Sequence, residues 1–161
     1  VKAATGKTVS EYASEKLWQP IGAQHPAYWT LDREGGDEKA FCCINSNARD
    51  FARFGRLYLH HGNWNGQQLV DSGFVAESVK AAPLTDFDGG PNERYGFHWW
   101  VMDYNNNPVF YARGILGQYV TVIPAEQTIV VRLGKKRELV KGDKHPQDLM
   151  VYLDAVEQMY W

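Results

Sequence analysis

The chain has 161 residues, of which 44% are hydrophobic and 14% aromatic, a composition that supports a buried core and excludes a disordered chain. Its formal net charge of −2 and its sequence pI near 6.2 exclude a strongly basic protein, so we expect no nucleic-acid partner. No apolar run is long enough to span a bilayer and no Cys or His spacing matches a metal site, so we expect no membrane span, no metal and no other cofactor.

The first predicted element is a helix that begins at Thr8. Thr8 and Glu11 form a capping-box pattern, in which each side chain accepts a hydrogen bond from the other residue's backbone N–H. Pro20 and Gly22 then end the helix. Residues 23–44 show no periodicity and predict a long connection, which in a compact domain is functional, disordered or an unrecognised element.

A second predicted helix runs to about His61 and is stopped by Gly62. Three residues could cap its first turn, namely Asn45, Ser46 and Asn47. The residues expected on its buried face are Phe51, Phe54, Leu57 and Tyr58. A short helix capped by Asp71 and Ser72 follows, and residues 86–92 predict an exposed loop.

From residue 95 onward the hydrophobic period changes to two, which predicts strands. The predicted strands are residues 95–102, 109–113, 118–123 and 128–133. Because short turns join them, we expect all of them to be antiparallel. A last helix beginning near Pro146 is expected to lie on the sheet. The sequence therefore predicts an α+β fold, with an antiparallel sheet of about four strands packed against helices, as one unit over residues 1–161.

The break between two of these strands is the first candidate site. Gly114 and Gly117 mark it, and backbone N–H groups in such a break can be left free to face a ligand. The alternative is that the two glycines only mark a bulge and that Arg113 is solvated. Cys43 and Asn45 could line a pocket, although a buried thiol and a helix cap are the simpler interpretations.

The cysteine pair and one histidine have structural interpretations. Adjacent cysteines, as at Cys42 and Cys43, cannot form an ordinary structural disulfide without distorting the backbone. His98 alternates within an aromatic predicted strand, which favours a packed side chain over a catalytic one.

Several segments, taken in order, resemble the C-terminal part of the serine β-lactamase-like superfamily, which includes class C β-lactamases, esterases and penicillin-binding proteins. The segments are Thr5-Gly-Lys-Thr8, Trp18-Gln-Pro-Ile-Gly22, Asn47 to Gly55 and Tyr95 to Trp100. His25-Pro-Ala-Tyr-Trp29 and Ala40-Phe-Cys42 look most like the branch of 6-aminohexanoate-dimer hydrolases. The resemblance implies that residues 1–161 are the C-terminal segment of a single β-lactamase/transpeptidase-like domain.

Two of the superfamily's three catalytic motifs are not found. No serine has a lysine three residues later, so Ser-x-x-Lys, which supplies the activated nucleophile, is missing. The literal Tyr-x-Asn match, Tyr104-Asn105-Asn106, falls in a predicted turn, and turn chemistry accounts for it. The resemblance places both motifs upstream of Val1. We therefore expect the upstream part of the same protein to be the partner that carries them, and this chain alone to be inactive.

The third motif matches Ala112-Arg113-Gly114, where the superfamily has Lys-Thr-Gly, His-Thr-Gly or Trp-Gly-Gly. The resemblance then implies that the Ile115 backbone N–H is an oxyanion-hole donor, that Gly114 lets substrate approach the backbone, and that Ala112 and Arg113 lie at the substrate. The cation that commonly holds a β-lactam carboxylate is absent at residue 112. Arg113 could replace it, although neighbouring strand residues face opposite sides.

The resemblance thus implies a serine hydrolase segment that acts by acyl transfer on a small amide or ester. Penicillin-binding or β-lactamase activity is an alternative within the superfamily. A different alternative is a non-catalytic module that binds a ligand or partner through aromatic side chains. The tryptophans that suggest it are Trp29, Trp64, Trp99 and Trp100. The sequence leaves the substrate and the compartment, periplasmic or cytoplasmic, open.

Overall fold

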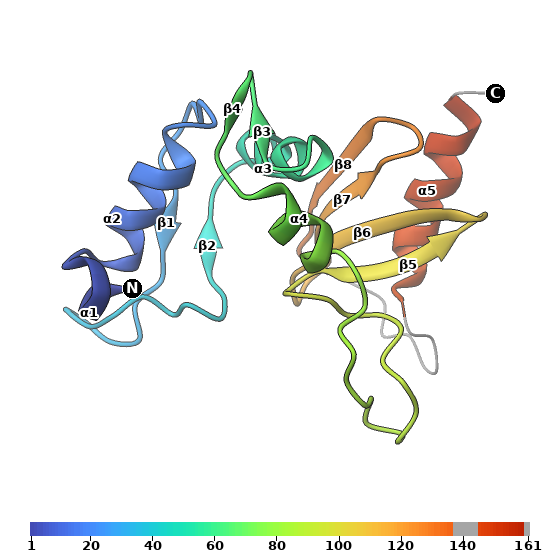
Figure 1. The fold of residues 1–161 in the computed structure, drawn as a ribbon, viewed down its shortest axis with the longest axis horizontal. Coiled ribbons are helices and arrows are strands. Elements are labelled where there is room, and N and C mark those ends of the chain that lie inside the picture. Colours follow the sequence, from blue (N-terminus) through green and yellow to red (C-terminus); the bar gives the residue numbers. More distant parts are fainter. Residues whose placement is uncertain (137–144, 160–161) are drawn as a thin grey trace.

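A four-stranded antiparallel sheet, in the order β5-β6-β7-β8, is the largest sheet among residues 1–136 and 145–159, which are the residues that the computed structural model describes (Figure 1). The strands are β5 (Trp100–Tyr104), β6 (Asn107–Arg113), β7 (Gln118–Ile123) and β8 (Thr128–Leu133). Each strand pairs with its neighbour in the chain. The predicted α+β fold with about four antiparallel strands is confirmed.

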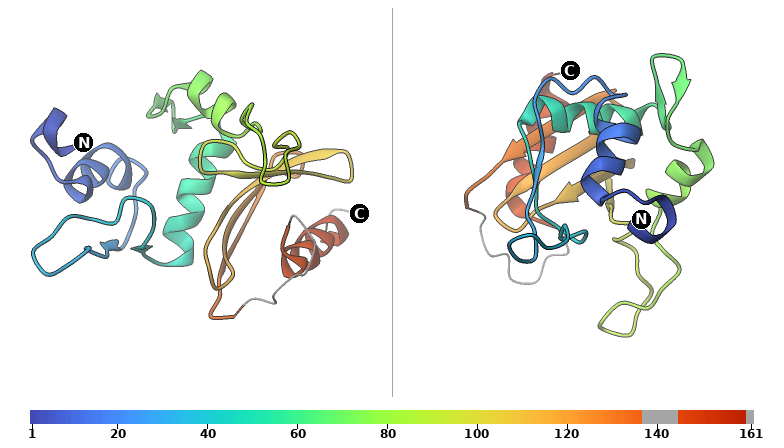
Figure 2. Two further views of the ribbon diagram at one scale, coloured as in Figure 1. Left: turned by 90° about the horizontal axis from the view of Figure 1, so that it is seen from below. Right: turned by 90° about the vertical axis from the view of Figure 1, so that its left-hand side faces the viewer.

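The sheet is covered by one helix on each face, α3 (Ala48–Leu59) and α5 (Gln147–Met159), as the edge-on view in Figure 2 shows. Alternation along the strands produces this arrangement because successive side chains point to opposite faces. The buried residues Val101, Phe110 and Val122 belong to the cluster beneath α3. The buried residues Val109, Tyr111 and Tyr119 belong to the cluster that includes the α5 residues Leu149, Leu153 and Val156.

Helix α3 approaches the sheet closely. Its N-cap is Asn47, whose side chain accepts the Asp50 N–H at 3.0 Å. Leu57 and Tyr58 are buried as predicted. Gly55 lies against the sheet, where an added Cβ would be 2.9 Å from the Ile129 side chain. The glycine therefore sets how near the helix comes to β7 and β8.

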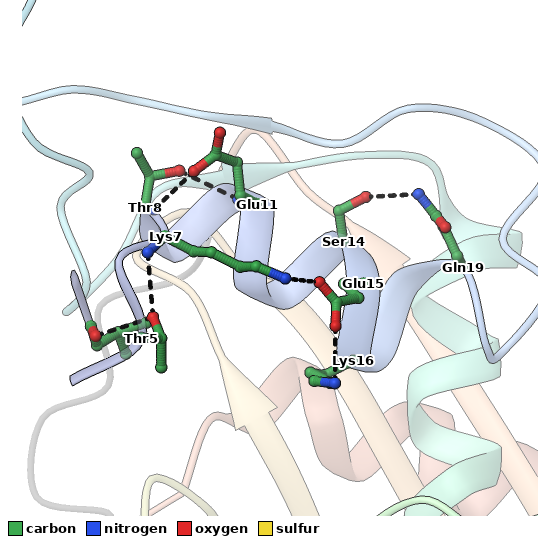
Figure 3. Close-up of polar contacts among 9 residues, drawn as sticks. Thr5, Lys7, Thr8, Glu11, Ser14, Glu15, Lys16 and Gln19 are labelled. Atoms are coloured by element: carbon green, nitrogen blue, oxygen red, sulfur yellow. Dashed lines mark hydrogen bonds and ion pairs between the residues drawn. The ribbon is translucent and has the colours of Figure 1, made fainter.

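The N-terminal part of the chain contains three short helical elements, α1 (Lys2–Thr5), α2 (Val9–Ala13) and the π-helical turn η1 (Ser14–Trp18). Figure 3 shows the predicted capping box: the Glu11 N–H donates to Thr8 Oγ1 at 3.2 Å, and the Thr8 N–H donates to the Glu11 carboxylate at 2.8 Å. Hydrogen bonds from Lys16 and Lys7 lower the pKa of Glu15 to about 2.

Residues 23–44 are not a single connection, as the sequence had suggested, but most of a hairpin. Strand β1 (Tyr28–Trp29) pairs with β2 (Ile44–Asn45), and Leu31 bridges Glu38 within the intervening loop. Strands of two residues are too short to show a period, which explains why the sequence pattern did not reveal them. A second small hairpin, β3 (Asn63–Trp64) with β4 (Gln67–Gln68), leads to α4 (Ser72–Ser78), which Asp71 caps.

The predicted strand over residues 95–102 was wrong in its first half, because β5 begins only at Trp100. Tyr95 forms an isolated bridge with Trp100, so the chain reverses between them. His98 adopts a left-handed φ of 64° in this reversal, and its side chain is exposed rather than packed. The aromatic alternation in this segment therefore reflects a loop. No helix in the described part of the chain has both the length and the apolar character needed to cross a membrane.

Candidate functional site

The turn between β6 and β7 is formed by Gly114 to Gly117. The last pair of the ladder is Arg113 opposite Tyr119, and the Gly114 N–H then donates to the Gln118 carbonyl at 2.8 Å. The turn is closed by the Gly117 N–H, which donates to the Gly114 carbonyl at 3.3 Å. Gly117 has a φ of 79°, a conformation that favours glycine.

Three of the four N–H groups in this turn have an acceptor inside the protein, and the fourth is that of Ile115. Leu116 donates to Oε1 of Gln118 at 3.0 Å, while Gly114 and Gly117 donate to carbonyls of the turn itself. Among residues 1–136 and 145–159, no acceptor is bonded to the Ile115 N–H. The Ile115 side chain is 83% exposed. The turn thus offers one backbone donor that no described residue occupies.

The other predicted site residues of this strand lie on opposite faces of the sheet. Ala112 packs against the cluster beneath α3. Arg113 lies on the α5 face, where its guanidinium carbon is 4.6 Å from the centroid of the Trp100 ring. Arg113 is therefore not simply solvated, as the bulge alternative had it, because its guanidinium makes a cation–π contact with Trp100.

Gly114 has little free space around it. An added Cβ would lie 2.6 Å from Oε1 and 2.9 Å from Cβ of Gln118. The glycine therefore lets the Gln118 side chain fold back over the turn. That a substrate approaches the backbone at this residue stays a prediction.

Cys43 and Asn45 lie on the β1–β2 hairpin, on the other side of α3 from the sheet (Figures 1 and 2). Within the described chain they are not brought together with the Gly114–Gly117 turn. Asn45 does not cap α3. Its side chain donates instead to the Cys43 carbonyl at 3.0 Å.

Cys42 and Cys43 form a disulfide, so the interpretation of Cys43 as a buried thiol was wrong. Their Cα atoms are 3.7 Å apart, as in any pair of neighbours. The backbone does depart from ordinary geometry, as expected for such a bond, since Cys43 has a φ of 79°. Both carbonyls are engaged: Trp29 Nε1 donates to that of Cys42 at 2.8 Å, and the Thr30 N–H to that of Cys43 at 3.1 Å.

Asp50 is a buried anchor for the segment before this hairpin. Its carboxylate accepts the backbone N–H groups of Gln24 at 2.9 Å and His25 at 3.0 Å. It also accepts the Asn47 side-chain amide at 2.6 Å. Burial raises the pKa of this carboxyl group, but the donors outweigh burial and hold the pKa below its ordinary value. The sequence suggested only a favourable charge at the helix N-terminus.

The literal Tyr-x-Asn match lies at the other end of β6 from the Gly114–Gly117 turn. Asn105 and Asn106 have φ of 51° and 62° and form the predicted β5–β6 turn. The Tyr104 hydroxyl donates to Asp154 of α5, and this bond, with burial, raises the pKa of Tyr104 to about 12. Its surroundings are those of a turn docked on α5.

Two residues that hold the Gly114–Gly117 turn were missed by the sequence reasoning. Gln118 bonds to the turn through both its backbone and its side chain. Arg132 donates to the Gly117 carbonyl from the end of β8, 15 residues away. Only the strand register connects Arg132 to this turn, so no local signal could have identified it. In the described ranges 1–136 and 145–159, no group of three or more His, Cys, Asp or Glu residues could hold a metal ion.

Comparison with known proteins agrees with this architecture. The beta-lactamase family model matches residues 1–152. A 6-aminohexanoate-dimer hydrolase from Paenarthrobacter ureafaciens is 31% identical over 140 residues, which are 83% of this chain and 35% of the relative. The chain thus spans about a third of that relative's length.

Two solved structures extend the comparison to three dimensions. A Bacillus anthracis protein provisionally named a 6-aminohexanoate-dimer hydrolase has a TM-score of 0.79 and 27% identity, over 99% of this chain and 40% of that one. A Bacteroides dorei DSM 17855 protein provisionally named a beta-lactamase shares the fold, with a TM-score of 0.60 and 16% identity over 83% of this chain and 46% of that one. With its sheet, its two covering helices and a family match over residues 1–152, the chain belongs to the beta-lactamase family.

Proposed function

We propose that this chain is the C-terminal segment of a serine hydrolase that cleaves amide or ester bonds by acyl transfer, of the 6-aminohexanoate-dimer hydrolase or esterase type. In this proposal the Gly114–Gly117 turn supplies an oxyanion donor and β6 forms one wall of the pocket. The upstream part of the same protein supplies Ser-x-x-Lys and Tyr-x-Asn. The observation that supports the proposal is the single unoccupied N–H of the turn, at Ile115.

The reaction would proceed in two stages, formation of an acyl-serine and its hydrolysis. The upstream serine oxygen attacks the carbonyl carbon and gives its proton to the lysine, and the carbonyl oxygen becomes an oxyanion. That oxyanion accepts the Ile115 N–H and the N–H of the serine. The intermediate collapses, the amine or alcohol leaves with a proton relayed by the tyrosine, and water then releases the acyl group as an acid.

The residue types around the turn favour a small amide or ester over a β-lactam. A lysine or histidine that could pair with a β-lactam carboxylate is absent at residue 112, which is an alanine. Arg113 lies on the other face of the sheet, over Trp100. The names of the Paenarthrobacter and Bacillus relatives agree with an amide substrate.

The alternative of an aromatic binding module has less support, because the tryptophans that suggested it are engaged inside the protein. Trp99 is 3% exposed. Trp29 donates to the carbonyls of Lys39 and Cys42. Trp64 lies under Arg56, and Trp100 under Arg113.

The test uses the protein encoded by the whole reading frame, assayed with the linear dimer of 6-aminohexanoate and with p-nitrophenyl acetate. Ile115→Pro removes the unoccupied N–H, whereas Ile115→Ala keeps it. We expect Ile115→Pro to lower kcat by about 10²–10³-fold, the loss typical of one oxyanion donor, with KM little changed. We expect Ile115→Ala to stay within about threefold of wild type, since its backbone donor remains.

A proline control separates loss of the donor from damage to the turn. Leu116→Pro removes a neighbouring N–H whose acceptor is the Gln118 side chain, so it perturbs the same turn without touching the unoccupied donor. Leu116→Pro shows how much of the loss comes from damage to the turn alone. The donor role is wrong if Ile115→Pro stays active, or if Ile115→Ala loses as much kcat as Ile115→Pro. A reading frame that lacks Ser-x-x-Lys upstream of Val1 would refute the serine-hydrolase proposal as a whole.

A further inference from the structure

Arg132 connects the Gly114–Gly117 turn to the rest of the α5 face. It stands opposite Tyr119 in the β7–β8 ladder, and its guanidinium carbon lies 5.7 Å from the centroid of the Tyr119 ring. Its Nη1 donates to the Gly117 carbonyl at 2.5 Å, and its Nη2 to the Lys136 carbonyl at 3.0 Å. The side chain is 24% exposed. One guanidinium thus joins the turn to the segment that leaves β8.

Two residues of α5 also contact the Arg132 side chain. Arg132 Nε donates to the Tyr152 hydroxyl at 3.1 Å, and Nη1 lies 3.4 Å from the Asp148 carboxylate. Asp148 in turn accepts the Tyr119 hydroxyl at 2.9 Å. A guanidinium is planar and carries several donors, so it can hold these partners at once in a fixed geometry.

Two glycines make room for the guanidinium. A Cβ added at Gly117 would fall on Nη1 of Arg132, and a Cβ at Gly134 would meet the same nitrogen and the Gly117 carbonyl. Gln118 completes the arrangement, because its side-chain NH2 donates to the Gly134 carbonyl at 2.7 Å while its Oε1 accepts the Leu116 N–H. The turn is therefore held from the β7–β8 side, while the side chains of Ile115 and Leu116 are exposed.

We propose that Arg132 is a positioning residue, which holds the Gly114–Gly117 turn in the conformation that leaves the Ile115 N–H unoccupied and oriented. This inference rests on the proposed function. An oxyanion donor stabilises the transition state only if it is already in place, because reorientation during the reaction would cost part of the stabilisation. Arg132 does not touch the substrate. Its effect is transmitted through the Gly117 carbonyl.

The experiment compares Arg132→Met and Arg132→Lys with wild type in the protein encoded by the whole reading frame. Methionine keeps much of the apolar stem but donates no hydrogen bond, whereas lysine keeps the charge and can reach one carbonyl. The matched control is Arg94→Met, since Arg94 is 26% exposed and its guanidinium is bonded to Asp86, which is not part of the turn.

Three quantities are measured. For p-nitrophenyl acetate we expect Arg132→Met to lower kcat by about tenfold, equivalent to about 1.4 kcal/mol, with KM within twofold of wild type. Phenylboronic acid forms an anionic tetrahedral adduct when the upstream serine oxygen bonds to its boron, and a boronate oxygen of that adduct then faces the same donors. It should bind more weakly by a similar factor. In hydrogen exchange followed by mass spectrometry, peptides covering residues 113–119 should exchange faster in Arg132→Met, and Arg132→Lys should restore part of each property.

The outcomes separate the two proposals. If Arg132→Met leaves exchange over residues 113–119 at the wild-type rate, Arg132 does not hold the turn. If exchange rises but kcat and boronate binding match those of Arg94→Met, the turn is held without consequence for the reaction, and the positioning role is wrong. If the wild-type protein hydrolyses neither substrate, the proposed function fails, and the exchange data still decide whether Arg132 holds the turn.

Discussion

Replacing Asp50 by asparagine perturbs a side chain with 0% exposure while keeping its shape. The carboxylate accepts the Gln24 N–H at 2.9 Å, the His25 N–H at 3.0 Å and the Asn47 amide at 2.6 Å. Asparagine keeps one acceptor oxygen and turns the other into an NH2 group that faces a donor. We therefore expect one or two of these donors to lose their acceptor.

Each buried donor left without an acceptor costs about 1–3 kcal/mol, so Asp50→Asn should lower the free energy of unfolding by about 2–5 kcal/mol. The pKa of Asp50 is lower in the folded protein than its ordinary value of 3.8. The stabilisation by the charged carboxylate is therefore fully present above pH 3.8 and is lost as the pH falls through the lower, folded pKa. The difference between wild type and variant should be constant near neutral pH and shrink only in strong acid.

Urea unfolding at pH 7, followed by tryptophan fluorescence, measures this loss. Trp18 is a local reporter, because its Nε1 donates to the His25 carbonyl at 2.9 Å. The control is Asp71→Asn, at an exposed N-cap that accepts the Phe74 N–H, where asparagine caps as well as aspartate. If Asp50→Asn costs no more than Asp71→Asn, the buried carboxylate is not the anchor that its contacts indicate.

Two more substitutions test the packing of the helices on the sheet. Gly55→Ala should destabilise the protein by about 1–3 kcal/mol, because the new Cβ would lie 2.9 Å from the Ile129 side chain and 3.1 Å from that of Val120. A melting temperature at or above that of wild type would contradict the close contact between α3 and the sheet. Tyr104→Phe removes the bond to Asp154, which raises the pKa of Tyr104 from 10.0 to about 12. In urea titrations, the difference in unfolding free energy from wild type should therefore be full below pH 10 and vanish as the pH rises through about 12. A difference that does not depend on pH would argue against this bond.

The elements that were predicted well have a strong local signal. The bounds of β7 and β8 follow from alternation over six residues each, and both agree with the prediction. The start of α5 follows Pro146, and Asn47 was among the predicted caps of α3. In each case the residues that decide the structure are neighbours in sequence, so the pattern carries the information.

The features that were missed depend on contacts between distant residues. The donors to Asp50 come from residues 24 and 25, and the donor to the Gly117 carbonyl comes from residue 132. The reversal at His98 was hidden because aromatic residues suit a loop that packs on α4 as well as they suit a strand: Phe97 lies 6.1 Å from Phe74 between ring centroids. Alternation shows which residues are apolar but not what they pack against.

The unoccupied donor of the β6–β7 turn belongs to the main chain. Substitutions at Ile115 and substitutions at the two glycines should therefore have different effects on the turn. The Ile115 side chain is 83% exposed and can vary in size and polarity without removing the N–H. Gly114 and Gly117 have no such freedom, since the space beside them is filled by Gln118 and Arg132. A library that varies residue 115 among residues other than proline, and keeps both glycines, should therefore change the exposed surface of the turn while its backbone stays intact.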